Sequence, residues 1–153
     1  MSETSATSTT DPVSEIQNYF VDRLKANAFM TEHEIAIIPE NAGDLEFQVD
    51  SAIGKFGACL IVATPKLSYF GKNADGTVWR VEDLSLIVSE IPTTNRGRAN
   101  YATAMSTAVQ AAEILNGNEC IPKTIIQKAW QDSNGLITVT ATFLTTFTIT
   151  ITI

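Results

Sequence analysis

The segment spanning residues 136–153 alternates apolar and polar residues. From Ile137 on, apolar residues take the odd positions and threonines the even ones, and only Leu144 and Thr145 break the pattern. A period of two predicts a β-strand with one buried and one solvated face. Fully extended, it would reach about 55–60 Å, two to three times an ordinary strand. We therefore expect the strand to bend, to carry a bulge near Leu144, or to pair with another subunit.

Three amphipathic helices are predicted before this segment. The first, residues 12–28, has Asp11 as N-cap and a proline at its first position. The second begins after Asp44 and ends at Gly57. The third is expected to be capped by Asn100 and to end at residues 116–117. Its alanines would allow close approach to a sheet, and its predicted apolar stripe consists of Tyr101, Met105, Ala108, Val109, Ala112 and Leu115.

The remaining patterns predict strands and turns. Residues 58–63 have no polar face, which is typical of a central strand covered on both sides. Residues 35–38 form a short strand ended by Pro39, and residues 78–91 form a second long strand ended by Pro92. We expect a loop or hairpin tip at 66–77, a polar loop at 93–98, and a hairpin pairing 124–130 with the terminal strand.

These elements predict an α+β fold in the order α-β-α-β-β-α-β-β. It would consist of a single mixed or antiparallel β-sheet flanked by helices, with a long C-terminal strand. Residues 1–11 are expected to be a flexible N-terminal tail, because they are rich in serine and threonine, and residues 12–153 a single domain.

Composition narrows the functional classes. The chain has 153 residues, 44% of them hydrophobic, which suffices for one sizeable core. Its net charge of −7 disfavours tight binding to nucleic-acid phosphates. No apolar run is long enough to span a membrane. Cys59 and Cys120 are unclustered, which suits a reduced intracellular setting and leaves a bridge between them open.

Residues for catalysis or cofactor binding are sparse. His33 is the single histidine, and a metal site with its neighbours Glu32 and Glu34 is disfavoured, since adjacent residues rarely converge on one ion. We find no nucleophile motif and no glycine-rich phosphate loop. An acidic group is better explained as the start of a helix than as a metal site or acid–base pair; it comprises Glu40, Asp44, Glu46 and Asp50. We expect no enzyme activity, cofactor or metal.

The basic residues concentrate at Arg96 and Arg98, with Lys72 and Arg80 as candidates to join them. Two arginines across a glycine could grip a carboxylate or a phosphate. A solvated loop and a subunit contact are the alternative interpretations. The tryptophans, Trp79 and Trp130, are expected to anchor a core or an interface.

Several segments together resemble a family of small proteins from tailed bacteriophages and prophages. The first run carries Ile38-Pro39-Glu40-Asn41, followed by Gly43-Asp44-Leu45-Glu46 and by residues 57–62. A long strand, Asn95-Arg96-Gly97, a helix over residues 103–115 and a closing hairpin follow. Over roughly residues 12–147 the pattern is similar to the tail terminator, or tail completion, proteins.

The resemblance implies a structural virion protein with a mixed sheet flanked by helices. Such proteins form a homo-oligomeric ring, usually a homohexamer, that caps the tail tube and joins it to the head–tail connector in the neck. It implies assembly in the bacterial host cytoplasm and a final place in the tail or neck. DNA would pass through the ring without specific binding, because an acidic lumen repels phosphates.

The C-terminus departs from the family pattern, since residues 148–153 are more regular and more apolar than it requires. A role as another neck, tube or baseplate component is therefore an alternative. In either case Arg96 and Arg98 would pair with carboxylates of a neighbour, and the terminal strand would add to an adjacent subunit or tube. The interface residues expected are Arg96, Arg98, Trp79, Phe147, Ile149, Ile151 and Ile153.

A second hypothesis belongs to a different class, a small-ligand or nucleic-acid binding module. It requires a concave site, and the residues proposed to line it are Trp79, Arg80, Arg96 and Arg98. The two hypotheses differ in whether these four side chains come together.

Overall fold

The computed structural model describes residues 11–117, 119–129, 135–146 and 148–152. Helices and strands are mixed along this part of the chain, which confirms the α+β class. The helices are α1 (Pro12–Lys25), α2 (Ala28–Glu32), α3 (Leu45–Phe56), α4 (Pro92–Asn95) and α5 (Ala104–Leu115). The strands are β1 (Ile37–Pro39), β2 (Ala58–Val62), β3 (Lys66–Asn73), β4 (Gly76–Glu82), β5 (Ser85–Glu90), β6 (Cys120–Ala129), β7 (Ile137–Thr145) and β8 (Thr148–Thr152).

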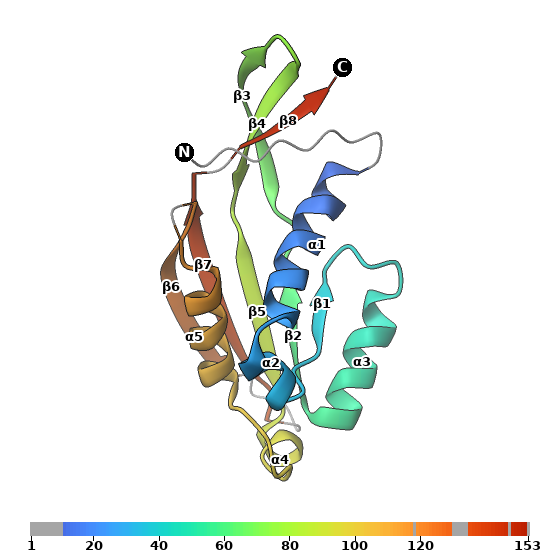
Figure 1. Ribbon diagram of the computed structural model, residues 1–153. Helices are drawn as coiled ribbons and strands as arrows, with labels where there is room; N and C mark the ends of the chain where they lie inside the picture. Colours follow the sequence, from blue (N-terminus) through green and yellow to red (C-terminus); the bar gives the residue numbers. More distant parts are fainter. Residues whose placement is uncertain (1–10, 118, 130–134, 147, 153) are drawn as a thin grey trace.

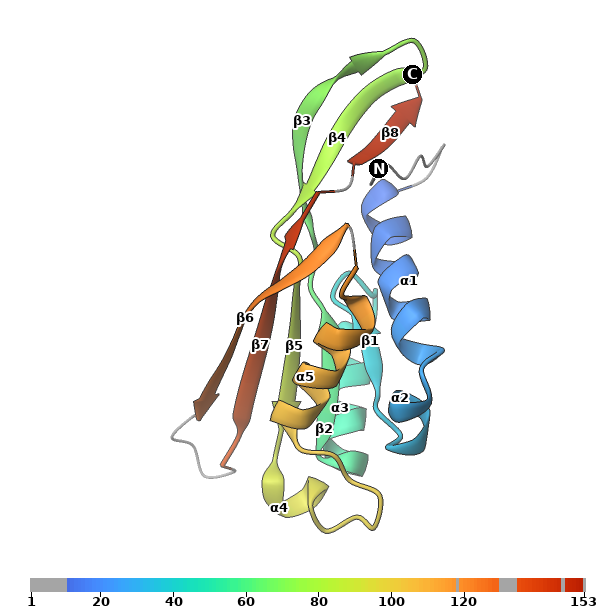
Figure 2. The ribbon, with the colours of Figure 1, turned by 60° about the vertical axis from the view of Figure 1, so that its left-hand side comes forward.

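The main sheet has the strand order β1-β2-β5-β7-β6. Strand β1 pairs with β2 in parallel, and the other pairings are antiparallel. Helices α1 and α5 lie on one face, α1 over β1 and β2 and α5 over β5, β7 and β6, while α3 packs on β1 and β2 from the other side (Figures 1 and 2). As predicted, β2 is a central strand with helices on both faces, and β6 pairs with β7.

The larger core lies between the sheet and helices α1 and α5. Phe20 and Leu24 of α1 are fully buried there against Leu60 and Leu86 of the sheet. On α5 the buried face consists mostly of alanines, which lets the helix axis approach the strands closely. A smaller cluster centred on Ala52, Ile38 and Cys59 holds α3 to the opposite face.

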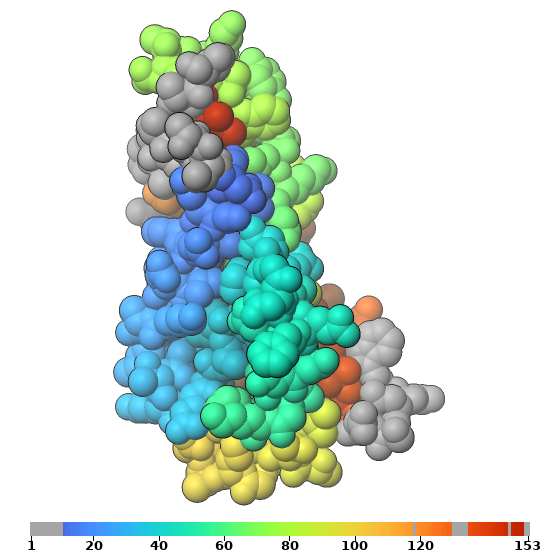
Figure 3. Space-filling view, turned by 90° about the vertical axis from the view of Figure 1, so that its right-hand side faces the viewer, coloured from blue at the N-terminus to red at the C-terminus, as the bar shows by residue number. Residues whose placement is uncertain are grey.

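Three strands of the main sheet continue into a second sheet, which we call the arm. It consists of β3, β4 and β8 in the order β3-β4-β8, the same neighbour relations that β2, β5 and β7 have below it. The arm rises beyond the helices (Figures 1 and 2), and Figure 3 shows it as a narrow extension of the molecule. The connection from β2 to β3 contains Pro65, which has no N–H for the ladder. The connection from β4 to β5 contains Asp83, which lies in the left-handed region at φ 56°.

The terminal strand bends, which is one of the three alternatives that its length left open. It breaks after Thr145, whose buried side chain donates to the Val81 carbonyl, and resumes as β8. Strand β8 pairs antiparallel with β4 of its own chain, from Arg80 opposite Thr148 to Gly76 opposite Thr152. Intrachain pairing thus occupies one edge of the segment that we expected to pair with another subunit.

Several predicted elements need correction. There are two sheets rather than one. Of the two alternatives for residues 66–77, a loop or a hairpin tip, the hairpin is right: β3 pairs with β4 up to Asn73 opposite Gly76. The long strand at 78–91 is divided into β4 and β5, because Asp83 leaves the extended conformation. The first helix ends at Lys25, since Asn27 is extended and caps α2. Residues 93–95 of the expected polar loop belong to the short helix α4, which begins at Pro92.

The third helix is the largest correction. Thr103, not Asn100, caps α5, and the Asn100 side chain donates to the Glu32 carbonyl instead. Of the predicted stripe, Tyr101, Met105 and Val109 are exposed, at 40%, 36% and 43%. The buried face is rotated away from them and consists of Ala104, Thr107, Ala108, Ala111, Ala112 and Leu115.

The predicted start of α1 and end of α3 hold. Asp11 caps α1 by accepting from the Val13 N–H, and Gly57 ends α3 in the left-handed conformation. Cys59 and Cys120 are both free and buried, on opposite faces of the sheet, so no bridge joins them. Burial raises the pKa of each thiol to about 11. No described helix is long and apolar enough to cross a membrane.

Candidate functional site

A buried polar cluster lies at the end of the sheet that is opposite the arm. Glu90, the last residue of β5, is fully buried. Its carboxylate accepts from the Asn95 side chain at 2.6 Å, from the Ala104 backbone N–H at 3.0 Å and from Arg96 Nε at 3.1 Å. One carboxylate thereby connects β5, α4 and the first turn of α5. These contacts hold the segment between β5 and α5 against the end of β5.

The protonation state of Glu90 follows from this surrounding. Burial by itself raises the pKa of the carboxyl group. The hydrogen bonds from Arg96, Asn95 and the Ala104 N–H, together with the charge of Arg96, outweigh burial and leave the pKa below its ordinary value. The carboxylate is therefore ionised at neutral pH and carries no proton to transfer.

Arg98 belongs to the same end of the molecule. Its guanidinium stacks over the Phe56 ring, 5.1 Å from the centroid, and donates to the Asn95 side chain and the His33 carbonyl. Glu34 lies 3.9 Å away as an ion-pair partner. His33 Nδ1 in turn lies 2.8 Å from the Asn100 carbonyl, to which it donates. The single histidine is a structural contact of this cluster.

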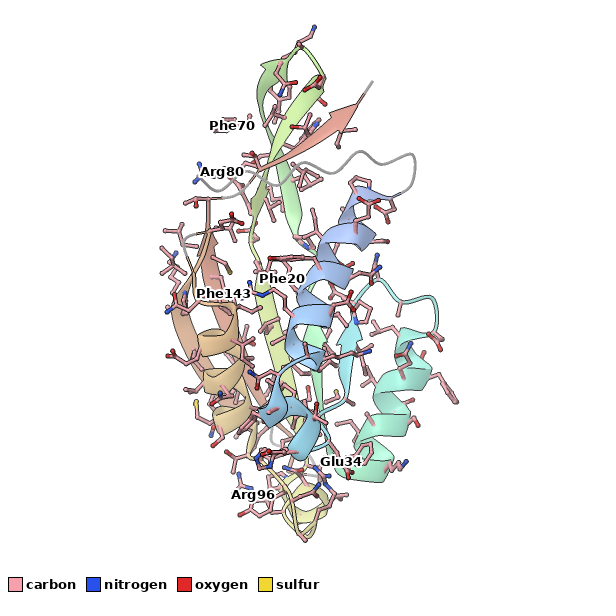
Figure 4. All side chains as sticks on the ribbon, viewed as in Figure 1. Phe20, Glu34, Phe70, Arg80, Arg96 and Phe143 are labelled. Atoms are coloured by element: carbon pink, nitrogen blue, oxygen red, sulfur yellow. The ribbon has the colours of Figure 1, made fainter. Side chains whose placement is uncertain are left out.

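The carboxylates that Arg96 and Arg98 contact belong to their own chain. These intrachain ion pairs occupy both guanidinium groups in the described structure, and the expected pairing with carboxylates of a neighbour stays a prediction. Lys72 and Arg80 do not join them, because both lie in the arm, and Figure 4 shows Arg80 and Arg96 at opposite ends of the molecule. The concave site expected of a binding module, lined by these arginines together with Trp79, is therefore not formed.

The acidic group is dispersed among structural contacts. Glu40 accepts from the Thr64 N–H, and Asp44, although it is the N-cap of α3, accepts from the Gln48 side chain rather than from the backbone. In the described residues no three histidine, cysteine or acidic side chains gather as a metal site would require.

The arm carries three aromatic residues, Tyr69, Phe70 and Trp79. Trp79 packs edge-to-face on Tyr69 with ring centroids 5.6 Å apart, and its Nε1 donates to Thr77. Tyr69 and Phe70 are 60% and 63% exposed, beside the bulge where the β3–β4 register shifts. Within the described residues β3 and β8 are the edges of this sheet. Unpaired strand edges and exposed rings are features of a contact surface.

The expected interface residues in β8 divide into two groups. Ile149 is only 2% exposed and packs in the main core, so it is not available to a neighbour. Ile151 is partly buried against the same core. Phe147, Ile153 and Trp130 lie outside the described residues, as do residues 1–10 of the predicted tail over residues 1–11.

Sequence reasoning missed a second surface, which we call the open face. It is the side of β5, β7 and β6 that faces away from α5, beyond the reach of α3. The ladder places Ile87, Thr140 and Ile126 in one row, and Thr142 and Thr124 in the next. Ile126 is 52% exposed. The threonines of β7 hid this surface in the sequence, because their polar side was interpreted only as solvated.

Comparisons with known proteins bear on the fold. No protein-family model matches the chain, and no curated protein gives a significant match. A solved structure does: a chain of the structure titled "Virion of native gene transfer agent (GTA) particle", with a TM-score of 0.55. The two chains share this fold. At 14% sequence identity the superposition covers 88% of this chain and 96% of the other.

Proposed function

We propose that this protein is a structural component of a phage-like virion. The observation that carries the proposal is the fold shared with a chain of the gene transfer agent virion, because it extends over 88% of one chain and 96% of the other. In the described residues Arg96 and Arg98 form ion pairs within their own chain, and exposed apolar groups lie on the arm, the open face and α5 as well as at Tyr19 and Phe47. This distribution suits assembly rather than chemistry.

The finer role that we propose is that of a tail terminator. In this role copies of the chain form a ring of six at the end of the tail tube and join it to the neck. The resemblance of residues 38–46 and 95–97 to that family supports this role, and the arm offers two strand edges for contact with a neighbouring ring. The excess of acidic residues suits a ring through which DNA slides without binding.

Co-production with the other tail components tests both levels of the proposal. Tails purified from such cells should contain the chain, and electron microscopy of them should show a ring at one end of the tube. Sedimentation velocity of the purified chain at several concentrations, alone and with tail tubes, should show a discrete oligomer.

The outcomes separate the alternatives. A ring elsewhere on the particle, in the neck or baseplate, would keep the virion role and reject the terminator role. A chain that is missing from the particles and remains monomeric with tail components would reject the proposal altogether.

A further inference from the structure

Two unpartnered surfaces lie back to back on the same three strands. On one side of β5, β7 and β6 lies α5, whose outer side presents Met105, Val109 and Glu113. Together with the exposed Tyr101 just before the helix, we call these residues the α5 stripe. On the other side lies the open face, with Ile87, Thr124, Ile126, Thr140 and Thr142. We infer that the α5 stripe of one copy packs on the open face of the next copy, with Glu113 pairing with Lys123 of that copy. This inference rests on the proposed ring.

The chemistry of the two surfaces is complementary. Three exposed apolar residues at intervals of four end in the carboxylate of Glu113, while an isoleucine-threonine surface has the exposed Lys123 at its upper end. Lys123 is the extra residue at the irregularity between Pro122 and Thr124, which adds it beside the Thr124–Thr142 pair. In the described part of the chain neither Glu113 nor Lys123 forms an ion pair.

The hydroxyl groups of Thr124 and Thr142 on the open face do not prevent apolar packing. Thr124 and Thr142 lie directly opposite each other, and their hydroxyls form a hydrogen bond across the strand pair. A partner that covers them therefore leaves neither hydroxyl without a partner. Ile126 and Ile87, in the neighbouring row, supply the apolar area.

The two surfaces also lie at matching heights along the strands. Helix α5 begins where the Ala104 N–H meets Glu90, and the ladder joins Glu90 through Ile137 to Ala129 at the end of β6. From there the helix rises about 14 Å to Glu113, a distance that a strand covers in about four residues. Going back along β6 from Ala129, this reaches Ile125, next to Thr124 and Lys123.

The spacing of the individual contacts agrees with this placement. Val109 and Glu113 are separated by about 6 Å along the helix axis. Ile126 and Thr124 are separated by about 7 Å along the strand. With Val109 on Ile126, Glu113 therefore lies within reach of the flexible Lys123 side chain.

A second copy of the chain fits both surfaces better than an unrelated partner. Because the α5 stripe and the open face lie on opposite sides of one layer, a single type of contact covers both of them in every copy. Such a head-to-tail contact keeps the strand direction from copy to copy and closes into a ring when the rotation permits. An unrelated partner on either surface would leave the other one uncovered.

Charge reversal tests the pairing. Glu113→Lys and Lys123→Glu should each weaken association by about tenfold or more, and the double variant should recover most of the loss. Lys128→Glu is the matched control, because Lys128 lies on the same face at the opposite end of β6. Combining Glu113→Lys with Lys128→Glu should not restore association. If it does, the copies pack in the reverse direction and the inferred contact is wrong.

Cysteine cross-linking tests the contact without relying on charge. Val109→Cys mixed with Ile126→Cys should give a disulfide-linked pair, whereas each variant alone should not. A chain with both substitutions should give a ladder of covalent multimers. Asn18→Cys, at an exposed position of α1, replaces Val109→Cys as the control and should not cross-link. The native thiols should interfere little, because both are buried.

The experiment is performed on the full chain, both purified and within isolated tails. If rings form but neither the cross-link nor the charge effects are seen, the contact is wrong and the proposed function stands. If Val109→Cys cross-links to a different tail protein, the occupant of the α5 stripe is not a second copy. If the chain neither oligomerises nor enters tails, the inference and the proposed function both fail.

Discussion

At the scale of single residues, Glu90 has the largest structural role among the charged groups. Its carboxylate is fully buried, whereas the Arg96 side chain that pairs with it is 46% exposed. The ion pair is therefore screened by solvent on one side. The hydrogen bonds from Asn95 and the Ala104 N–H are buried, and they bind the end of β5 to the start of α5. We expect most of the stabilisation to come from them.

Substitution of Glu90 tests this assignment. Glu90→Gln should lower the free energy of unfolding at neutral pH by about 2 kcal/mol or more, because buried donors lose a charged acceptor. Arg96→Met should cost less than about 1 kcal/mol. Urea unfolding of the two variants and the native chain gives both values. A larger loss for Arg96→Met would show that the ion pair dominates instead.

The pH dependence of stability follows from the lowered pKa of Glu90. A carboxyl group whose pKa is lower in the folded state stabilises the fold above its ordinary pKa of 4.5, and this contribution disappears as the pH falls through the folded-state pKa. The stability difference between the native chain and Glu90→Gln should therefore be constant near neutral pH and shrink below about pH 4.5. Thermal unfolding of both proteins between about pH 3 and pH 7 would measure this difference.

Gly57 shows how one residue controls a helix end. It has φ 77°, and a Cβ atom there would overlap the Asn95 backbone nitrogen and approach Thr94 Cβ to 2.8 Å. Gly57→Ala should therefore destabilise the protein by about 2 kcal/mol or more. Gly54→Ala, inside the same helix and with open space around it, should be neutral or stabilising by up to about 1 kcal/mol. Gly57→Ala should lower the melting temperature, whereas Gly54→Ala should leave it unchanged or raise it.

At the scale of elements, the terminal strand serves its own fold first. Pairing of β8 with β4 and burial of Ile149 tie the strand to the core that α1 covers. Removal of residues 147–153 would expose the inner edge of β4 and part of the core. Such a truncation cannot separate folding from assembly, so point substitutions are the sharper experiment.

Ile149→Ala should lower the free energy of unfolding by about 2–4 kcal/mol, because it opens a cavity in a fully packed site. Phe47→Ala is the matched control, since Phe47 is 73% exposed on α3, and it should change stability by less than about 0.5 kcal/mol. Urea unfolding at low protein concentration compares them. An Ile149→Ala variant as stable as the native chain would mean that β8 is not part of the core.

Helix α5 illustrates a limit of periodicity as evidence. Its C-terminal stop and the burial of Ala108, Ala112 and Leu115 were predictable, but Tyr101, Met105 and Val109 were assigned to the same buried stripe. The sheet instead accepts the alanine face, since only small side chains allow the helix to lie close to β5, β7 and β6. Tyr101, Met105 and Val109 are left on the outside.

At the scale of the whole molecule, stability is distributed unevenly between the helix-covered sheet and the arm. Strands β5 and β7 lie between two neighbouring strands under α5, whereas β3 is an edge strand with mostly exposed residues. Amide hydrogens of β5 and β7 should therefore exchange at least about tenfold more slowly than those of β3. Hydrogen exchange read by mass spectrometry tests this, and equal rates would indicate that arm and core unfold as one unit.

The sequence by itself determined the α+β class, the central strand β2 and the glycine end of α3, and it indicated that the terminal segment is too long for one straight strand of a small domain. Each depends on residues close together in the chain: an apolar run, a left-handed glycine or a broken alternation. It also indicated how little catalytic chemistry the chain offers, because too few of the required residue types are present.

Only the tertiary structure decided which partners the charged residues take and which surfaces stay uncovered. Glu90 meets Ala104 across a turn, Arg80 and Arg96 lie at opposite ends, and the open face exists because α3 covers only β1 and β2. These are relations between residues distant in the chain. A local pattern shows that a face is apolar or polar, but the packing of whole elements decides what covers it.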